Sequence, residues 1–331
     1  MKIRRVGAGT VLRKSMMEII LAMLCIALWL RTRDFMTTGN LLNVLRNVSM
    51  QGVIAFAMTM VIISGEIDLS VGSMVAFSGC LCAWLVAYLT TAKHMPPVSA
   101  VVLAIPATVL AGVLVGMTTG LLRVRFRVPT FITTLAWMTV LKGLAELITN
   151  GFPISYDVEK LGWFNFLGGG YVHGIPFPAI VLVVVFLIIQ FVMNFTSFGR
   201  SIYAVGGNAE AARLSGIKVT KVKLAVMATV AGLAAIAGIL LSSQIMSGSA
   251  MSGVGWELDV IAAVIIGGCS LMGGAGRVWG TFVGVIFLGV VVNGMTLLDI
   301  NEYWQHVVRG ALILGAVLIN VAPASKSSSG S

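Results

Sequence analysis

Long apolar runs separated by short polar stretches dominate the 331 residues of this chain. A helix needs about 20 mostly apolar residues to cross the hydrocarbon core of a bilayer. The runs are continuous, as in VLVVVFLIIQFVMNF at 181–195, and lack the two-residue alternation of a membrane β-barrel. We therefore expect an all-α, polytopic helical membrane protein with about ten transmembrane helices, at 15–33, 48–65, 69–91, 98–122, 128–149, 175–195, 222–245, 257–273, 278–298 and 303–323.

Composition agrees with this class, because 58% of the residues are hydrophobic and only 10% are charged. Soluble domains average about 25% charged residues. The first apolar run follows a basic start, but no small-residue cleavage site comes after it, only RTRDF. We read it as an uncleaved first span and not as a signal peptide.

The distribution of Lys and Arg predicts the orientation. Cytoplasmic loops of membrane proteins carry an excess of these residues. With the N-terminus inside, the inner stretches hold Lys2, Arg4, Arg5, Arg13, Lys14, Arg123, Arg125, Arg127, Arg200, Arg213, Lys218, Lys221, Lys223, Arg277 and Lys326. The outer stretches hold Arg31, Arg33, Arg46, Lys93 and Lys160, and Lys142 and Arg309 fall within spans. Both termini are then cytoplasmic, and the net charge of +10 reflects topology and contact with anionic lipid, not nucleic acid.

Four cysteines, Cys25, Cys80, Cys82 and Cys269, lie in apolar segments without CxxC spacing. Cysteine in such surroundings behaves as a small buried hydrophobic residue. The sequence therefore predicts neither a metal site nor a disulfide framework.

Two connecting segments are long. Residues 150–175 form an outer loop with several aromatic side chains, and residues 196–221 form an inner loop rich in charged and small residues. Within the inner loop we expect a short amphipathic helix, with Asn208 as its N-cap, Glu210 in its first turn and Gly216 at its end. Its spacing fits an ordinary interfacial helix as well as a docking element for another protein.

Several stretches together resemble a known family. They are EAARLSG at 210–216, GEIDLSVGSMVAF at 65–77, ELDVIAAVIIGG at 257–268 and SLMGGAGRVWGTFVG at 270–284. In order, over nearly the whole chain, they are similar to the membrane permeases of ribose-type (simple-sugar) ABC importers. One departure is Glu66, which stands where the ribose pattern has a glycine, so the particular sugar stays open.

The resemblance implies a permease subunit in the bacterial inner membrane that works by alternating access. It implies a partner ABC ATPase bound through the inner loop, a periplasmic sugar-binding protein and a second permease copy, identical or related. The coupling residues would be Asn208, Glu210, Ala211, Ala212, Arg213, Gly216 and Ile217. Because the chain has no GxxxxGK[ST] phosphate loop, ATP and Mg²⁺ would be bound by the partner, and this chain would hold no cofactor and be no enzyme.

A pattern of glutamate, apolar residue and aspartate occurs twice, at 66–68 and at 257–259. This repetition suggests two repeats, 48–149 and 222–323, inverted in the membrane as in many transporters. The pairs would then lie toward opposite faces, 66–68 inward and 257–259 outward. We expect one permease domain over 1–323 and a disordered tail at 324–331.

Each pair has two competing roles. Ser64, Asp68 and Ser70 are natural helix caps, which is the simpler reading of the first pair. Alternatively, the carboxylates line a water-filled pathway at a broken helix and bind sugar hydroxyls. Glycoside chemistry would need opposed carboxyl groups, which nothing in the sequence arranges, so we expect no catalytic residue.

Further polar positions extend the candidate pathway. Asn43, Asn47 and Gln51 share one helix face, and Phe131 could stack on a sugar, although core packing is the commoner use of such a residue. The candidate pathway is thus Asn47, Gln51, Glu66, Asp68, Phe131, Glu257 and Asp259.

Two other sets of residues read as structural. Lys142 and Glu146, at i and i+4, should neutralise each other. Gly276, Gly280 and Gly284 should form a close-packing helix face.

Three other functions remain open from the residues. The first is an ABC permease for a nucleoside or another small polar solute. The second is a secondary transporter that couples ion movement through Glu66 and Asp68. The third, a simple membrane anchor, fits poorly with the long inner loop and the polar residues inside the spans.

Overall fold

The computed structural model describes residues 16–321, and its long elements are all helices. They are α2 (Met16–Arg31), α3 (Thr38–Ile63), α4 (Val71–Thr91), α5 (Pro97–Arg125), α6 (Thr130–Thr149), α9 (Phe177–Phe195), α10 (Ser197–Gly207), α12 (Val219–Ile245), α13 (Trp256–Ile266), α14 (Val278–Leu297) and α15 (Glu302–Val321). The predicted basic N-terminal residues Lys2 to Lys14 and the predicted tail at 324–331 lie outside the described residues.

Each of the ten predicted spans coincides with a helix, but seven helices of the described region are long and apolar enough to cross a membrane. These are α3, α4, α5, α6, α9, α12 and α14. The all-α polytopic class is therefore confirmed, whereas the helices α2, α13 and α15 do not meet the requirement by length and composition.

The predicted eighth span, 257–273, is much shorter than expected. Helix α13 has 11 residues, which at 1.5 Å per residue is about 16 Å, roughly half the thickness of the hydrocarbon core. It ends because Gly267 caps it and Gly268 follows with a φ of +87°. Residues 267–277 then run as turns and irregular backbone up to α14. The second span also differs, since α3 begins at Thr38 and not at 48.

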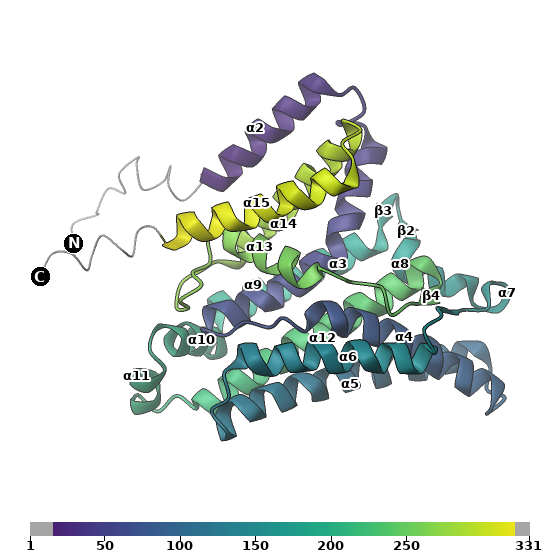
Figure 1. Ribbon diagram of the computed structural model, residues 1–331, viewed down its shortest axis with the longest axis horizontal. Helices are drawn as coiled ribbons and strands as arrows, with labels where there is room; N and C mark the ends of the chain where they lie inside the picture. The colour runs from purple at the N-terminus through teal and green to yellow at the C-terminus, as the bar shows by residue number, and fades with distance from the viewer. Residues whose placement is uncertain (1–15, 322–331) are drawn as a thin grey trace, which may run out of the picture.

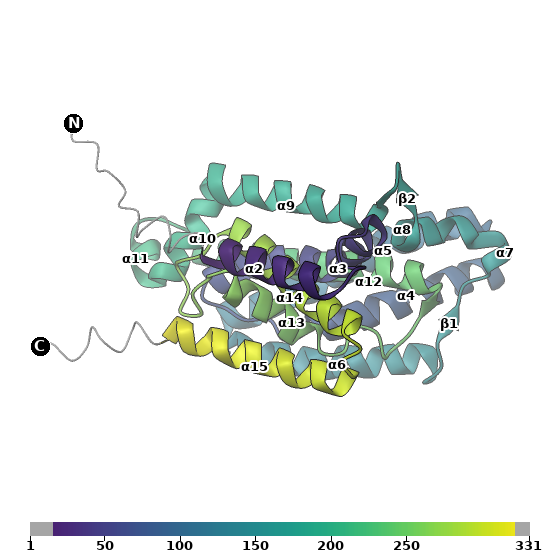
Figure 2. The same ribbon diagram turned by 90° about the horizontal axis from the view of Figure 1, so that it is seen from above.

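Helices α3 and α12 form the centre of the molecule. Helix α12 packs against α5, α4 and α3, while α3 also packs against α9, α13 and α14. In Figure 1, α5 and α6 form the lower layer, and α2 and α15 lie at the top, on the other side of the central helices. Figure 2 shows α9 along one side and α15 along the other.

Small residues allow the central helices to approach closely. On α5, a side chain at Gly112, Gly116 or Gly120 would collide with α12, and at Gly116 the Cα of Ala228 lies 2.8 Å from the Cβ position. Without a hydrophobic drive between helices in lipid, such contact favours association.

Of the three glycines predicted to form a packing face on the ninth span, two lie in the helix and one lies before it. Gly280 and Gly284 lie in α14 directly against Gly267 and Ala263. Gly276 lies before the helix begins, with its Cβ position beside Cys269. The close contact between α13 and α14 therefore involves two of the three glycines.

The predicted 150–175 loop is folded, at the end of the molecule opposite residues 209–214 (Figure 1). It contains β1 (Ile154–Ser155), α7 (Val158–Leu161), the 3₁₀ helix η1 (Gly162–Asn165), α8 (Phe166–Gly169), β2 (Tyr171–Val172) and β3 (Ile175–Pro176). Strand β1 pairs antiparallel with β4 (Ser247–Gly248), and β2 pairs with β3. Tyr156 also hydrogen-bonds Ser242 of α12 at 2.9 Å, so the loop is anchored to the end of α12.

The four cysteines carry no disulfide: Cys80, Cys82 and Cys269 are buried, and Cys25 is half-buried. The prediction of small buried hydrophobic cysteines is confirmed for the three buried ones.

Candidate functional site

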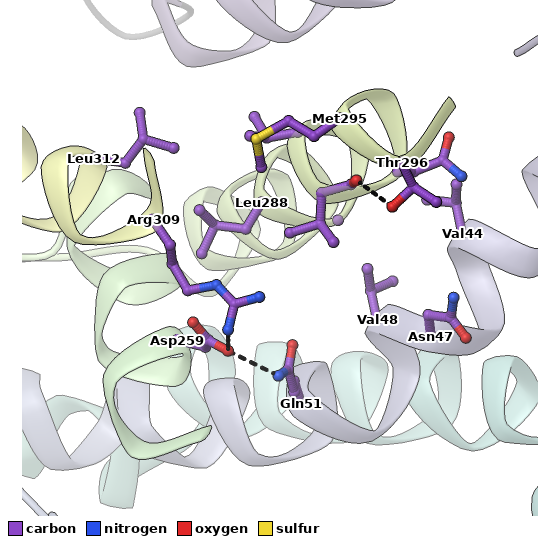
Figure 3. Close-up of a pocket in the computed structure, with 14 residues that line it drawn as sticks. Val44, Asn47, Val48, Gln51, Asp259, Leu288, Met295, Thr296, Arg309 and Leu312 are labelled. Carbon is purple, nitrogen blue, oxygen red and sulfur yellow. Dashed lines mark hydrogen bonds and ion pairs between the residues drawn. The ribbon is translucent and has the colours of Figure 1, made fainter. Parts of the chain in front are cut away.

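Helices α3, α13, α14 and α15 enclose a cavity of about 280 Å³ (Figure 3). Polar and apolar side chains line it together. The lining residues are Val44, Asn47, Val48, Gln51, Asp259, Leu288, Gly289, Val291, Val292, Asn293, Met295, Thr296, Arg309 and Leu312. Three of the residues predicted for the pathway, Asn47, Gln51 and Asp259, thus come from separate parts of the chain to one cavity.

An ion pair and an amide form the polar centre of this cavity. Asp259 is 7% exposed, and its Oδ2 accepts hydrogen bonds from Gln51 Nε2 at 3.1 Å and from Arg309 Nη1 at 3.0 Å. Figure 3 shows the three side chains converging from α3, α13 and α15. Charge-assisted bonds of this kind are stronger than neutral ones, so they fix the carboxylate in place.

Two polar atoms of this ion pair are unsatisfied. Asp259 Oδ1 and Arg309 Nε are buried and have no hydrogen-bond partner among the described residues. An unsatisfied buried polar atom costs about 1–3 kcal/mol, and more when the group is charged. A hydroxyl has the chemistry to satisfy both, because it donates to a carboxylate oxygen and accepts from a guanidinium N–H, but a ligand would reach these closed atoms only after the side chains shift.

The rim of the cavity carries an amide pair. Asn40 Nδ2 donates to Asn293 Oδ1 at 3.0 Å, and Asn293 Nδ2 donates to Asn40 Oδ1 at 2.8 Å. The reciprocal bonds join α3 to α14 next to the cavity. Asn40 was not predicted, since nothing in the sequence links it to α14.

Arg309 was also missed as a site residue, although the sequence placed it within the last span. A lone cation in an apolar helix needs a partner, which was the available signal. The position of that partner, Asp259, could not be read from the sequence, because the two residues are 50 positions apart.

The other predicted pathway residues lie elsewhere. Glu257 points toward α4, where a side chain on Gly72 would meet its carboxylate. Phe131, on α6, is 52% exposed and does not line this cavity. Asp68 accepts hydrogen bonds from the backbone N–H (2.8 Å) and Oγ (2.6 Å) of Ser70, so it stabilises the turn before α4. Ser70 is the N-cap residue of α4 but makes no side-chain cap hydrogen bond, so neither side chain caps the helix as predicted.

Glu66 is the centre of a second polar cluster. It lies in the turn between α3 and α4, and its side chain is 5% exposed. Arg123 Nε lies 2.8 Å from Glu66 Oε1, Lys223 Nζ donates to the same oxygen, and Thr130 Oγ1 donates to Oε2. Three helices, α5, α6 and α12, therefore contact one carboxylate.

The predicted inner-loop helix is present as α11 (Ala209–Leu214). Asn208 Oδ1 accepts from the N–H groups of Glu210 (3.0 Å) and Ala211 (2.9 Å), which makes Asn208 the N-cap. Gly216 follows the helix with a φ of +84°, and Ile217 donates its N–H to Ala212 at 3.0 Å.

Charged and apolar side chains of α11 are open to a partner. Arg213 binds Glu210 at 2.5 Å, with both side chains exposed, and Leu214 is 75% exposed. The hydrogen bond from Arg213, opposed only weakly by desolvation, holds the pKa of Glu210 below its ordinary value. The helix lies at the end of the molecule opposite α7 (Figure 1).

The expected ion pair between Lys142 and Glu146 is formed, with 3.6 Å between Nζ and Oε1. Lys142 also donates to the carbonyl oxygen of Ala250 at 2.5 Å. Across residues 16–321, no group of three or more His, Cys, Asp or Glu side chains is arranged to hold a metal ion.

Comparison with known proteins adds a family. Residues 40–317 match the profile of a family described as branched-chain amino acid transport system / permease component. The chain is 41% identical over 286 residues to the ribose import permease protein RbsC of Haemophilus influenzae, covering 86% of each protein.

Two further relatives show the same similarity. The chain is 42% identical over 287 residues to the ribose import permease protein RbsC of Bacillus subtilis, covering 87% of this chain and 86% of the relative. It is 38% identical over 316 residues to the L-arabinose ABC transporter permease protein AraH of Azospirillum brasilense, covering 96% and 90%. No solved structure matches.

Proposed function

Because this chain belongs to the permease components of ABC transport systems, in the group of the ribose import permeases, we propose that it carries a monosaccharide across the membrane. The relatives are named for ribose and L-arabinose, two small neutral sugars. The proposed function of this chain is therefore sugar import as a permease subunit.

The cavity supplies the observation that carries the sugar assignment. Asp259 and Arg309 neutralise each other, yet each keeps one buried polar atom without a partner in the described structure. A neutral sugar can satisfy both atoms without adding a charge to a buried site, where an unpaired charge is costly. The apolar side chains of Val44, Val48 and Leu288 supply a surface for the C–H faces of a sugar ring.

The cavity lies where a pathway between helices is expected. Ligand sites in transporters lie near the middle of the membrane, at broken helices. Helix α13, which carries Asp259, has such a break at its end. In this proposal α2, α13 and α15 complete ten membrane segments, and the repeats 48–149 and 222–323 are inverted, as the two carboxylate pairs suggest.

The orientation follows from charge. The end of the molecule with α11 holds Lys218, Lys221 and Arg213, so we place it in the cytoplasm together with both termini. The folded 150–175 segment then faces the periplasm, and the protein is a multi-pass protein of the bacterial inner membrane.

Partners follow from the same arrangement. Helix α11, with its exposed Leu214 and its Glu210–Arg213 pair, is the proposed contact for the ATPase subunit, which would bind ATP and Mg²⁺. A periplasmic sugar-binding protein would dock on the 150–175 side, and a second permease copy would complete the pathway. Closure of the ATPase dimer would drive alternating access.

Reconstitution tests this function. The chain is purified with its ATPase subunit, placed in proteoliposomes and supplied with the binding protein and radiolabelled ribose, arabinose or xylose. We expect uptake of one of these sugars that requires hydrolysable ATP. Uptake driven by a proton or sodium gradient without ATP would contradict the proposal, as would ATP-driven uptake of leucine with no sugar transported.

A further inference from the structure

The turn that contains Glu66 contacts the helices before and after α11, which are α10 and α12. After α11 the chain enters α12, whose Lys223 donates to Glu66 Oε1. Before α11, Gly206 of α10 lies so close to Ile63 that a Cβ at Gly206 would collide with the carbonyl oxygen of Ile63. A force applied to α11 therefore reaches the same turn, at the end of α3, by two routes.

Helix α3 can carry that force to the cavity. It runs as one helix from Thr38 to Ile63 without proline, so it has no built-in kink. Gln51 lies twelve positions before Ile63, roughly 18 Å along the helix at 1.5 Å per residue. A shift of the turn would thus move Gln51 relative to Asp259, which lies on a different helix, α13.

The two cations around Glu66 are not equivalent. Both contact the same oxygen, Oε1, whereas Oε2 is bound by Thr130. The side chain of Lys223 is 11% exposed and that of Arg123 is 32% exposed. The helices that carry the two cations pack closely against each other, since a Cβ at Gly120 of α5 would collide with Leu224 of α12. The carboxylate therefore keeps both partners and is not an unpaired buried charge, which would be strongly destabilising.

This geometry makes one firm connection. Glu66 ties the start of α12 to the α3–α4 turn through Lys223, and Arg123 of α5 and Thr130 of α6 bind the same carboxylate. A displacement of α12 would therefore be passed on to the turn.

We propose that Glu66 is the positioning residue that transmits movement of the ATPase-binding helix α11 to α3 and the sugar cavity, through its buried ion pair with Lys223. The proposal rests on the ATP-driven sugar import proposed above. It assigns a role to Glu66, which departs from the ribose-type motif at this turn, and it concerns the ratio of transport to ATP hydrolysis, not sugar recognition.

The test measures sugar transported per ATP hydrolysed by the reconstituted complex. The first variant is Lys223→Gln, in which Glu66 keeps Arg123 as partner and folding is preserved. We expect the transport-to-ATP ratio to fall about tenfold, while the conservative Lys223→Arg stays within about twofold of wild type. A wild-type ratio in Lys223→Gln would overturn the proposal.

A double variant separates transmission from simple structural support. Replacing both partners of a buried ion pair by uncharged groups is often neutral for stability. Glu66→Gln/Lys223→Met should therefore assemble and unfold thermally like wild type, yet keep the low transport-to-ATP ratio. If this double variant regains the wild-type ratio, the pair is only structural and the proposal fails.

Glu146→Gln is the control, because it removes the carboxylate of an ion pair on α6 away from the turn and leaves the hydrogen bond from Lys142 to Ala250 in place. It should keep the wild-type ratio; an equal fall in this control would overturn the specific role of Glu66. A wild-type complex without ATP-driven sugar uptake would overturn the proposed function and this proposal together, whereas normal wild-type uptake with unaffected variants would reject the role of Glu66 alone.

Discussion

Arg309 of α15, which is half-buried, and Asp259 of α13, which is buried, form an ion pair with 3.0 Å between Nη1 and Oδ2, in which each side chain keeps one polar atom without a partner in the described structure. A purely structural ion pair is best stabilised when its remaining atoms are also hydrogen-bonded. The pair therefore has the form of a site completed by a ligand, and this form gives the first prediction.

Asp259→Asn should reduce sugar transport strongly. The variant keeps the size of the side chain but removes the charge that Arg309 and Gln51 contact. A hydrogen bond to a charged group is worth about 1.5–3 kcal/mol, which corresponds to a fall of about tenfold to a hundredfold. Radiolabelled uptake in proteoliposomes measures it.

Asp299→Asn is the control for Asp259→Asn, because Asp299 is exposed in the turn after α14 and outside the cavity. We expect its uptake to equal wild type. Equal uptake by Asp259→Asn and wild type would contradict the assignment of the cavity.

Gly284→Ala should destabilise the packing of α13 on α14. A Cβ at this position would collide with the backbone of Ala263 and lie 3.1 Å from the nitrogen of Gly267. Overpacking of this kind costs about 1–3 kcal/mol, and thermal unfolding in detergent should show a lower midpoint.

Gly143→Ala on α6 is the matched substitution, since no atom lies within 4 Å of its Cβ position. Alanine is favoured over glycine in a helix by about 1 kcal/mol, so this variant should be at least as stable as wild type. Equal midpoints for Gly284→Ala and Gly143→Ala would count against the close contact.

Gly216→Ala should weaken binding of the ATPase subunit. Gly216 has a φ of +84°, where an L-residue with a side chain is disfavoured by about 1–2 kcal/mol. The strain would fall on the end of α11 and reduce affinity by about five- to thirtyfold. Affinity is measured by titrating the ATPase onto the permease in nanodiscs.

Gly207→Ala serves as the comparison for Gly216→Ala, because it lies on the other side of α11, with open space at its Cβ position and no left-handed backbone. We expect its affinity for the ATPase to match wild type. The coupling role of α11 would be refuted by unchanged binding of Gly216→Ala together with unchanged uptake.

The Glu210–Arg213 pair predicts a pH dependence. The hydrogen bond from Arg213 lowers the pKa of Glu210 from 4.5. A lowered pKa means that the pair stabilises α11 above the ordinary pKa and that this contribution is lost as the pH falls through the lowered value. Amide hydrogen exchange of 208–217 should therefore be faster in Glu210→Gln than in wild type by a constant ratio from about pH 8 to about pH 5.5.

The two proteins should converge only when the pH falls through the lowered pKa of Glu210, because the wild-type side chain is then protonated as well. Convergence already near neutral pH would show that the pair is not formed in solution. Arg213→Gln should give the same exchange ratio as Glu210→Gln if the two side chains act on α11 through each other.

The long helices could be predicted from the sequence because a helix that lies in lipid needs a long run of apolar residues. The caps of α11 could also be predicted, since Asn208 and Gly216 act on their own neighbouring backbone. The pairing of Asp259 with Arg309 could not, because hydropathy does not tell which faces of two distant helices meet. The short α13 was missed for a related reason: its apolar residues continue past the glycines that end it.

The cluster around Glu66 shows that contacts between charged residues are equally hard to predict from the sequence. Arg123 and Lys223 entered the sequence analysis as markers of the cytoplasmic side, which accounts for their position along the membrane normal. Their shared contact with Glu66 depends on how α5 and α12 pack against the α3–α4 turn. A charged residue can therefore both determine the membrane topology and hold helices together, and only its effect on topology can be read from the sequence.

Helix α13 lies between two glycine-containing loops, with left-handed glycines on either side at Gly255 and Gly268. Its contact with α14 is close, because Gly280 and Gly284 lie directly against Gly267 and Ala263. Asp259 would therefore stay with α14 when α3 shifts, so that the movement changes the distance from Gln51 to a carboxylate that keeps its own place. The irregular backbone that made this region hard to predict thus separates a short helix that holds the site from a long helix that moves against it.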